Sequence, residues 1–186
     1  MLLQDRVENY SKVFPKYPPL ICTDRWLYGV WMIGNYYKRE HGYYGEYPPS
    51  YIKRVRSLFP DCNNVLHAFS GAVTDGGVTV DNNKDLNPDI VAEITDLPIL
   101  DDRFDLVMAD PPYSQEDAKK YGQKKLVNKR LALQELARVT KPGGHIVWLD
   151  LMVPIYKKTI TEMVGNICLY TGTNRRVRMI SIFKVV

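Results

Sequence analysis

Apolar runs bounded by polar turns divide the chain into alternating short strands and helices. Short apolar runs predict strands, and apolar residues spaced three and four apart predict helices. The expected strands are residues 64–70, 78–81, 90–94, 104–110 and 145–151. The expected helices are residues 48–59, 131–139 and 155–164. Residues 166–171 and 176–186 then predict a closing hairpin.

The run FDLVMADPPY, residues 104–113, carries most of the candidate chemistry. Its apolar first part predicts a buried strand. The two prolines force this strand to stop at Asp110, because proline cannot donate to a sheet ladder. In open α/β sheets, ligands bind just outside the carboxyl ends of the strands. Asp110, Pro111, Pro112 and Tyr113 are therefore expected where a reaction would take place.

These four residues suit the transfer of a group to an exocyclic amino nitrogen, whose lone pair is delocalised into its ring. The Asp110 carboxylate and the Pro111 carbonyl can each accept one of its hydrogens, which frees the lone pair for attack. Pro112 keeps the backbone rigid, and the Tyr113 ring offers a stacking face worth about 1–3 kcal/mol for a planar base. The alternative is a strand that ends in a proline turn with a surface aspartate.

The DPPY tetrapeptide after an apolar strand resembles the catalytic motif of S-adenosylmethionine-dependent amino-methyltransferases, best known from DNA adenine-N6 methyltransferases. The helix, KPGG turn and strand over residues 131–151 resemble a structural segment of class I methyltransferases. The resemblance begins near Asn64 and runs to the C-terminus. It implies an α/β fold with a Rossmann-like, mostly parallel sheet and a C-terminal antiparallel hairpin. It also implies S-adenosyl-L-methionine as the cofactor, with no metal.

The resemblance also assigns cofactor contacts. The turn at residues 69–71 resembles the glycine loop that approaches the cofactor, and a side chain at Gly71 would obstruct that approach. Asp81 ends the second strand, where an acid typically binds both ribose hydroxyls of a nucleotide-like cofactor. A surface aspartate is the alternative for Asp81. The expected cofactor contacts are Pro48, Ser50, Phe69, Ser70, Gly71, Asp81, Asn82, Asp96, Leu97 and Asp110.

The chain departs from this family between the first two strands. Only residues 72–77 separate Gly71 from the second strand, and this segment with its two glycines cannot form the helix that normally lies there. Such a short crossover is hard to reconcile with a parallel βαβ unit, which needs about a dozen residues. Either the second strand is displaced, or the N-terminal segment covers the face that the helix would occupy.

Residues 1–60 are rich in aromatic side chains and hold two of the three tryptophans. We expect them to form an extension that packs on a catalytic domain of residues 61–186. Residues 26–39 predict a short helix or strand, and Ser50 is a suitable cap for the helix that follows it. The alternative is a surface for nucleic acid or a partner, in which basic residues such as Lys38, Arg39 and Arg54 lie among the aromatic rings.

Residues 114–129 are polar and rich in lysine, which predicts a mobile loop beside Asp110. Basic side chains next to an active site can bind the phosphates of a nucleic acid. The alternative is a solvated helix face, which is what charge runs commonly form. The expected substrate contacts are Tyr113 and the lysines Lys119, Lys120, Lys124 and Lys125.

Composition limits the classes of protein further. A chain of 186 residues suits one domain, and a net charge of +4 permits nucleic-acid binding. No apolar run is long enough to cross a membrane, and the first residues do not resemble a secretory signal. Three widely spaced cysteines fit neither a disulfide framework nor a metal pair. We therefore expect a cytoplasmic protein without a membrane segment.

The expected reaction is methyl transfer from S-adenosylmethionine to the exocyclic amino group of a nucleic-acid base. Adenine N6 in DNA is the leading acceptor, and guanine N2 or adenine N6 in RNA is the runner-up. A non-catalytic protein that binds the cofactor or a partner subunit is the third interpretation. No long target-recognition segment is inserted in the chain. Recognition of DNA would therefore come from residues 1–60 or from a protein partner, or would be relaxed.

Overall fold

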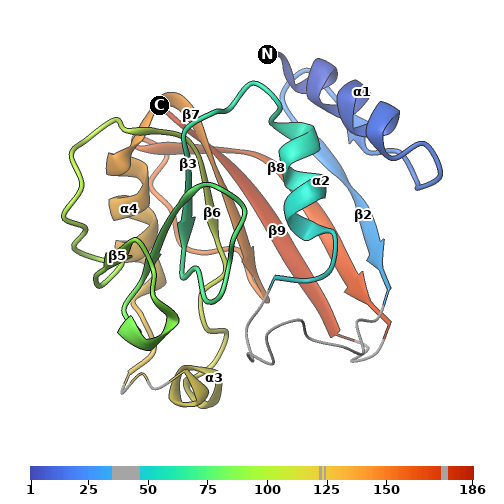
Figure 1. Ribbon diagram of the computed structural model, residues 1–186. Coiled ribbons are helices and arrows are strands. Elements are labelled where there is room, and N and C mark those ends of the chain that lie inside the picture. Colours follow the sequence, from blue (N-terminus) through green and yellow to red (C-terminus); the bar gives the residue numbers. More distant parts are fainter. Residues whose placement is uncertain (35–46, 122, 124, 173–175) are drawn as a thin grey trace.

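The computed structural model describes residues 1–34, 47–121, 123, 125–172 and 176–186, which form one mixed sheet with flanking helices (Figure 1). Within these residues the strands lie in the order β1-β2-β8-β9-β7-β6-β3-β4-β5. Their bounds are β1 Ile21–Cys22, β2 Leu27–Ile33, β3 Val65–Ala68, β4 Val78–Asp81, β5 Ile90–Val91, β6 Phe104–Ala109, β7 Thr140–Asp150, β8 Thr161–Thr171 and β9 Arg176–Val185.

The helices are short and lie on the outside of the sheet. Their bounds are α1 Leu3–Val13, α2 Tyr51–Leu58, the 3-10 turn η1 Lys84–Leu86, α3 Gln115–Lys120 and α4 Lys129–Val139. In the described part of the chain, none of them has the length and apolar character that a membrane crossing requires.

The strand directions are mostly parallel. Along the row β5, β4, β3, β6 and β7 each strand runs parallel to its neighbours, whereas β9 runs antiparallel to both β7 and β8. The prediction of an α/β, Rossmann-like sheet with a C-terminal antiparallel hairpin is therefore confirmed. As a result, the carboxyl ends of β4, β3, β6 and β7 lie along one edge of the sheet.

The shortened crossover between β3 and β4 is also confirmed, because no helix lies between these strands. β4 nevertheless pairs in parallel with β3, with Leu66 opposite Val78, so the second strand is not displaced. Close packing makes this possible. A Cβ atom on Gly77 would lie 2.9 Å from the Val65 carbonyl oxygen and 2.9 Å from Cδ2 of His67. Only glycine lets the crossover lie this tightly against β3.

Two apolar layers cover the two faces of the sheet. Leu106 and Met108 of β6 face the layer that contains residues of α1 and α2, and Val107 and Ala109 face the layer that contains α4. Trp31 of β2 is fully buried in the first layer, where its ring lies 5.7 Å from that of Tyr10. Full burial of each large apolar side chain stabilises the fold by about 1.5–3 kcal/mol. The N-terminal segments thus cover the face of the sheet on which a longer helix between β3 and β4 would pack.

The residues around α2 differ from the expectation. Ser50 occupies the N-cap position of α2 as expected, but its backbone is left-handed (φ 60°) and its side chain makes no capping bond. Its hydroxyl instead accepts a hydrogen bond from Nε of Arg54 at 3.4 Å. Arg54 is only 1% exposed, and its guanidinium lies 4.9 Å and 4.2 Å from the ring centres of Phe14 and Tyr17. Arg54 therefore does not belong to a nucleic-acid surface. Lys38 and Arg39 lie outside the described residues.

Four further segments correct the expected elements. The helix predicted over residues 155–164 is wrong, because β8 begins at Thr161 and no helix lies between it and β7. Residues 155–160 form neither helix nor strand, and Thr161 and Met163 pair with Val185 and Phe183 at the end of β9. Residues 141–144, expected as a turn, lie within β7. The loop predicted over residues 114–129 contains α3, and the predicted third strand is reduced to β5.

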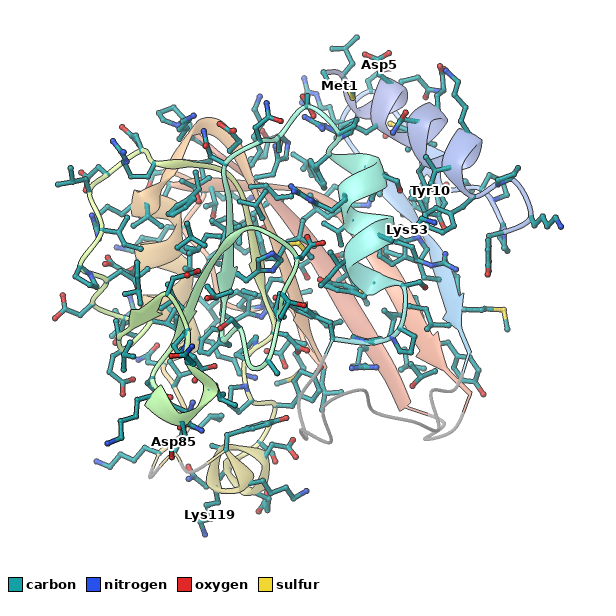
Figure 2. The ribbon with its side chains drawn as sticks, viewed as in Figure 1. Met1, Asp5, Tyr10, Lys53, Asp85 and Lys119 are labelled. Carbon is teal, nitrogen blue, oxygen red and sulfur yellow. The ribbon has the colours of Figure 1, made fainter. Side chains whose placement is uncertain are left out.

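We expect Arg54→Ala to lower the free energy of unfolding by about 2–4 kcal/mol, because it removes a buried cation that packs on two rings and donates to the Tyr10 hydroxyl. The exposed Lys53 on the same helix provides the control, since Lys53→Ala should change stability by less than about 0.5 kcal/mol. Urea denaturation measures both variants (Figure 2 labels Lys53 and Tyr10). Equal losses for the two variants would contradict a structural role for Arg54.

Candidate active site

Asp110 lies at the carboxyl end of β6, in the middle of the edge that the parallel strands share. β6 ends at Ala109, as the prolines predict, and both Pro111 and Pro112 are buried. The carboxyl end of β3 lies on one side of Asp110 and that of β7 on the other. The sheet therefore brings the DPPY residues next to the candidate cofactor loop.

The Asp110 carboxyl has a tyrosine as its hydrogen-bond donor. The Tyr113 hydroxyl donates to Oδ1 of Asp110 at 2.7 Å and accepts a hydrogen bond from Nη1 of Arg178 at 3.2 Å. Burial raises the pKa of Asp110 to about 7, although the Tyr113 hydrogen bond and the charge of Arg178 oppose that rise. Tyr113 was predicted as a stacking face, yet here its hydroxyl occupies one of the two Asp110 oxygens.

Two more tyrosines lie beside this carboxyl. The Tyr47 and Tyr51 rings stack with centres 5.0 Å apart, and the Tyr47 hydroxyl donates to the Met108 carbonyl at 3.3 Å. Burial raises the pKa of both phenols, and the charge of Asp110 adds to that rise. The Tyr51 hydroxyl is buried and has no hydrogen-bond partner in the described part of the chain. Sequence reasoning did not identify Tyr51, because its position in α2 looked like an ordinary core position.

A buried ion pair closes the β7 side of the site. Asp150 is 2% exposed, and Nζ of Lys129 lies 2.7 Å from its Oδ2. Asp150 also accepts hydrogen bonds from Nε1 of Trp148 and from the backbone N–H of Leu151. The carboxylate is thus fully occupied, and it ties the start of α4 to the end of β7. It is not placed to accept a substrate hydrogen.

The residues predicted to hold the cofactor lie on the other side of Asp110. The turn after β3 is left-handed at Phe69 (φ 57°) and at Gly71 (φ 55°). The Gly71 N–H donates to Oδ2 of Asp81 at 3.0 Å, and the Asn83 N–H donates to Oδ1 at 2.9 Å. Ser70 is 1% exposed, and its hydroxyl has no partner among the described residues. This turn therefore combines an unused buried hydroxyl, which can donate, with a carboxylate, which accepts, and this combination suits a polar cofactor.

The remaining predicted cofactor contacts are less uniform. Asn82 donates to Oε1 of Glu93 at 3.0 Å and accepts a hydrogen bond from Gln123 at 3.3 Å, so the segment after α3 reaches β4. Asp96 is exposed, but Leu97 is 5% exposed and packs in the layer under α4. Pro48 is buried near Tyr47, whereas Ser50 is exposed. Contacts of these residues with a cofactor stay predictions.

The predicted lysines lie farther out. Lys119 and Lys120 are exposed on α3, and Lys125 is exposed just before α4, beyond the carboxyl end of β6 (Figure 2 labels Lys119). Nζ of Lys120 lies 3.6 Å from Oδ1 of Asp117, and this carboxylate partly neutralises the positive charge of Lys120. Lys124 lies outside the described residues. Contact of these lysines with phosphate stays a prediction.

Arg178 of β9 is a second functional candidate, besides Tyr51, that sequence reasoning missed. It comes within hydrogen-bond distance of Tyr113 although 65 residues separate them in the chain. A signal was present, because Arg178 alternates with Ile180 and Ile182, which are 0% and 1% exposed. A charged residue on the buried face of a strand costs free energy unless it is paired, so its presence there indicates a specific role.

A cavity of about 790 Å³ lies at the opposite end of the sheet, among residues of α1, the starts of β7 and β8 and the end of β9. Its main charges already pair with one another, Arg6 with Asp61 and Lys141 with Asp105. Asp110 and the candidate cofactor turn do not line it. The carboxyl edge is therefore the better candidate for the reaction.

Comparisons with known proteins give partial similarities, and no protein-family model matches the chain. The chain is 28% identical over 94 residues to the demethylmenaquinone methyltransferase of Mycolicibacterium paratuberculosis, which covers 47% of this chain and 36% of that protein. It is 37% identical over 68 residues to the enzyme of the same name from Corynebacterium urealyticum, covering 37% of this chain and 25% of that protein. The chain thus spans about a third of the length of these relatives or less.

Among solved structures, the PH0226 protein of Pyrococcus horikoshii OT3 superposes with a TM-score of 0.45 and 14% identity. The match covers 74% of this chain and 92% of that protein.

Proposed function

We propose that the protein is an S-adenosylmethionine-dependent methyltransferase that modifies the exocyclic amino group of a nucleic-acid base, with adenine N6 in DNA as the leading acceptor. The observation that carries this proposal is the half-buried Asp110 carboxyl at the end of β6, next to Pro111, Pro112 and the Tyr113 hydroxyl. The similarity of part of the chain to two methyltransferases supports the reaction class. We place the catalytic machinery in residues 61–186.

The cofactor would lie across β3 and β4, where Ser70, Gly71 and Asp81 meet. S-adenosylmethionine supplies a methyl group on a sulfonium, which is already activated for transfer. The Ser70 hydroxyl has no other partner among the described residues, and the Asp81 carboxylate has lone pairs left after its two backbone bonds. The edge of the sheet then directs the cofactor toward Asp110 on the adjacent β6.

On the acceptor side, Asp110 and the Pro111 carbonyl would each accept one hydrogen of the amino group. Each acceptor raises the electron density on the nitrogen and fixes its direction of attack. The Tyr113 hydroxyl must leave Oδ1 of Asp110 before the base can bind there, and the ring is then free to stack on the base. A base in duplex DNA would have to be flipped out of the helix.

RNA stays the second nucleic-acid acceptor. The names of the curated relatives add a third kind of acceptor, a quinone-like small molecule. A protein partner that supplies target recognition is part of the proposal, since no long recognition segment is inserted between the described strands of the sheet. A cofactor-binding protein without activity is the remaining alternative.

One experiment separates these acceptors. The chain is incubated with labelled S-adenosylmethionine and, in parallel, with single-stranded DNA, duplex DNA, ribosomal RNA or a demethylated quinol. Mass spectrometry then identifies the product. N6-methyladenine in DNA supports the proposal, and methylated bases in RNA alone support the second acceptor. Transfer only to the quinol, or cofactor binding with no transfer to any acceptor, rejects it.

The pH dependence should follow Asp110. Only the ionised carboxylate accepts an amino hydrogen with full strength, and burial raises the pKa of this group to about 7. We therefore expect kcat/KM to rise by about tenfold per pH unit up to pH 7 and to level off above it. Tyr113→Phe removes a hydrogen bond that lowers this pKa, so its midpoint should lie at higher pH. A profile that is flat between pH 5.5 and 8.5 would exclude this role.

A further inference from the structure

Arg178 is a half-buried cation that contacts no carboxylate directly in the described part of the chain, and its link to Asp110 runs through the Tyr113 hydroxyl. Nη1 donates to the Tyr113 hydroxyl at 3.2 Å, and no described carboxylate oxygen lies within 4 Å of the guanidinium. Its Nε is buried and has no hydrogen-bond partner among these residues. Burying a charge without a partner costs free energy, so such a group is expected to bind something the chain itself does not provide.

Tyr51 provides a second unused donor at the same place. Its side chain is 0% exposed and its hydroxyl has no partner among the described residues. Burial raises its pKa, the charge of Asp110 adds to the rise, and the charge of Arg178 opposes it. Arg178 of β9 donates to the Tyr113 hydroxyl, which itself donates to Asp110. Tyr51 of α2 stacks on Tyr47, whose hydroxyl donates to the Met108 carbonyl two residues before Asp110. Two unrelated elements therefore direct unused donors to one location.

The strand order puts this location on the acceptor side of Asp110. From the candidate cofactor turn the sequence of strands is β3, β6, β7 and β9, so Asp110 lies between Gly71 and Arg178. Neighbouring strands are about 4.8 Å apart, which places β9 roughly 14 Å from β3. A cofactor held at Gly71 and Asp81 would present its reactive end at Asp110. Arg178 then faces the molecule that receives the methyl group.

The other nearby cation is not available for the same task. Lys129 lies 2.7 Å from a carboxylate oxygen of the buried Asp150, and that pair is complete. The guanidinium of Arg178 is planar and can offer parallel donors to two oxygens of one anion, a geometry that matches phosphate. The Tyr51 hydroxyl can donate to a third oxygen.

We propose that Arg178 and Tyr51 form an anion subsite that binds a phosphate of the acceptor, next to the base whose amino group Asp110 holds. The inference rests on the proposed function and names the acceptor class as phosphate-bearing, which a neutral quinol is not. Tyr113 links the two halves of the site. When its hydroxyl leaves Asp110 for the incoming amino group, the bond to Arg178 can be exchanged for the phosphate.

The first test needs no base and no catalysis. Titration of the full chain with inorganic phosphate, followed by ³¹P NMR, should give saturable binding that Arg178→Gln weakens by about 10-fold or more, as expected for charge-assisted hydrogen bonds. Arg178→Lys should retain part of the affinity. Arg103→Gln is the matched control, because Arg103 is exposed at the other end of β6. Absence of binding to the native chain, or equal binding to the native and Arg178→Gln chains, overturns the subsite.

The second test separates the subsite from the reaction. With an oligonucleotide acceptor, Arg178→Gln should raise KM by about 10-fold or more with a smaller change in kcat, since the phosphate contact exists before and during transfer. Affinity for S-adenosylhomocysteine should stay within about twofold of the native value. A loss of that affinity with an unchanged KM overturns the subsite and assigns Arg178 to the cofactor.

The two proposals can fail separately. Arg178-dependent phosphate binding without methyl transfer to any nucleic acid keeps the subsite and rejects the proposed acceptor. Methyl transfer to DNA or RNA with the same KM in the native and Arg178→Gln chains keeps the reaction and rejects the subsite.

Discussion

Asp110→Ala is expected to reduce kcat for methyl transfer by about 10²–10³-fold, the scale seen when one preorganised polar group is removed from a transition state. The variant loses the acceptor that orients the amino nitrogen, and the Pro111 carbonyl alone leaves the nitrogen free to rotate. Asp110→Asn keeps one acceptor oxygen without the charge and should lie between alanine and the native chain. Single-turnover rates with saturating cofactor measure the effect directly.

The same substitution should not destabilise the fold. The pKa of Asp110 in the folded chain, about 7, lies above the ordinary value for aspartate. The folded state therefore binds this proton more tightly than the unfolded state does, and the stabilising effect falls as pH rises from about 4 to 7. Asp110→Ala removes this decrease in the free energy of unfolding. Its free energy of unfolding at pH 8 should equal or exceed the native value.

Asp105 at the other end of β6 gives the matched control. Nζ of Lys141 lies 2.6 Å from its Oδ1, and the N–H groups of Asn63 and Asn64 donate to Oδ2. Asp105→Ala should therefore lower stability and leave kcat unchanged. Retention of more than a tenth of the native rate by Asp110→Ala would falsify the assignment of Asp110 to the transfer step.

The end of β6, the missing helix between β3 and β4, and the C-terminal hairpin could be predicted because they depend on local sequence rules. Proline cannot continue a strand, so the end of β6 at Ala109 followed from Pro111 and Pro112. The missing crossover helix followed from the number of residues available. The hairpin of β8 and β9 followed from their apolar and β-branched content, although β8 begins at Thr161, before the predicted residue 166.

The predicted helix over residues 155–164 failed because apolar spacing alone does not distinguish a short helix from a strand that is buried on both sides. Thr161, Glu162 and Met163 pair with Val185, Lys184 and Phe183 at the end of β9, and this pairing decides for the strand. The end of β9 lies outside the local sequence window, so no local pattern could reveal this pairing. Tertiary pairing commonly overrides local helix preference in this way.

The groups that complete the candidate site were hidden for a related reason. Tyr113 was predicted, but Tyr51 of α2 and Arg178 of β9, the unused donors near it, were not. Each of these two residues looks ordinary in its own window. Arg54 shows the same limit in reverse, since its basic neighbours suggested a surface, but the fold buries it against the rings of Phe14 and Tyr17.

Asp81→Ala is expected to weaken cofactor binding by about 10–100-fold, because it removes the two proposed hydrogen bonds from the ribose hydroxyls to the carboxylate. Each hydrogen bond to a charged group contributes about 1.5–3 kcal/mol, but Asp81 also stabilises the turn, so only part of that free energy favours the cofactor. Oδ2 of Asp81 holds the Gly71 N–H and Oδ1 holds the Asn83 N–H, so the carboxylate fixes both loops at the ends of β3 and β4. Loss of the side chain would release the turn around Ser70 as well as remove the proposed ribose contact.

Asp85 separates these effects from a general loss of negative charge. It is exposed in η1, four residues after Asp81, and its position is labelled in Figure 2. Asp85→Ala should therefore leave the affinity for S-adenosylhomocysteine, measured by calorimetry, unchanged. Asp81→Asn can still accept one backbone hydrogen bond, so it should keep the turn better than alanine does. If Asp81→Asn binds as weakly as Asp81→Ala while its thermal stability stays native, the carboxylate contacts the cofactor itself. If both variants bind normally, the cofactor does not lie over β4.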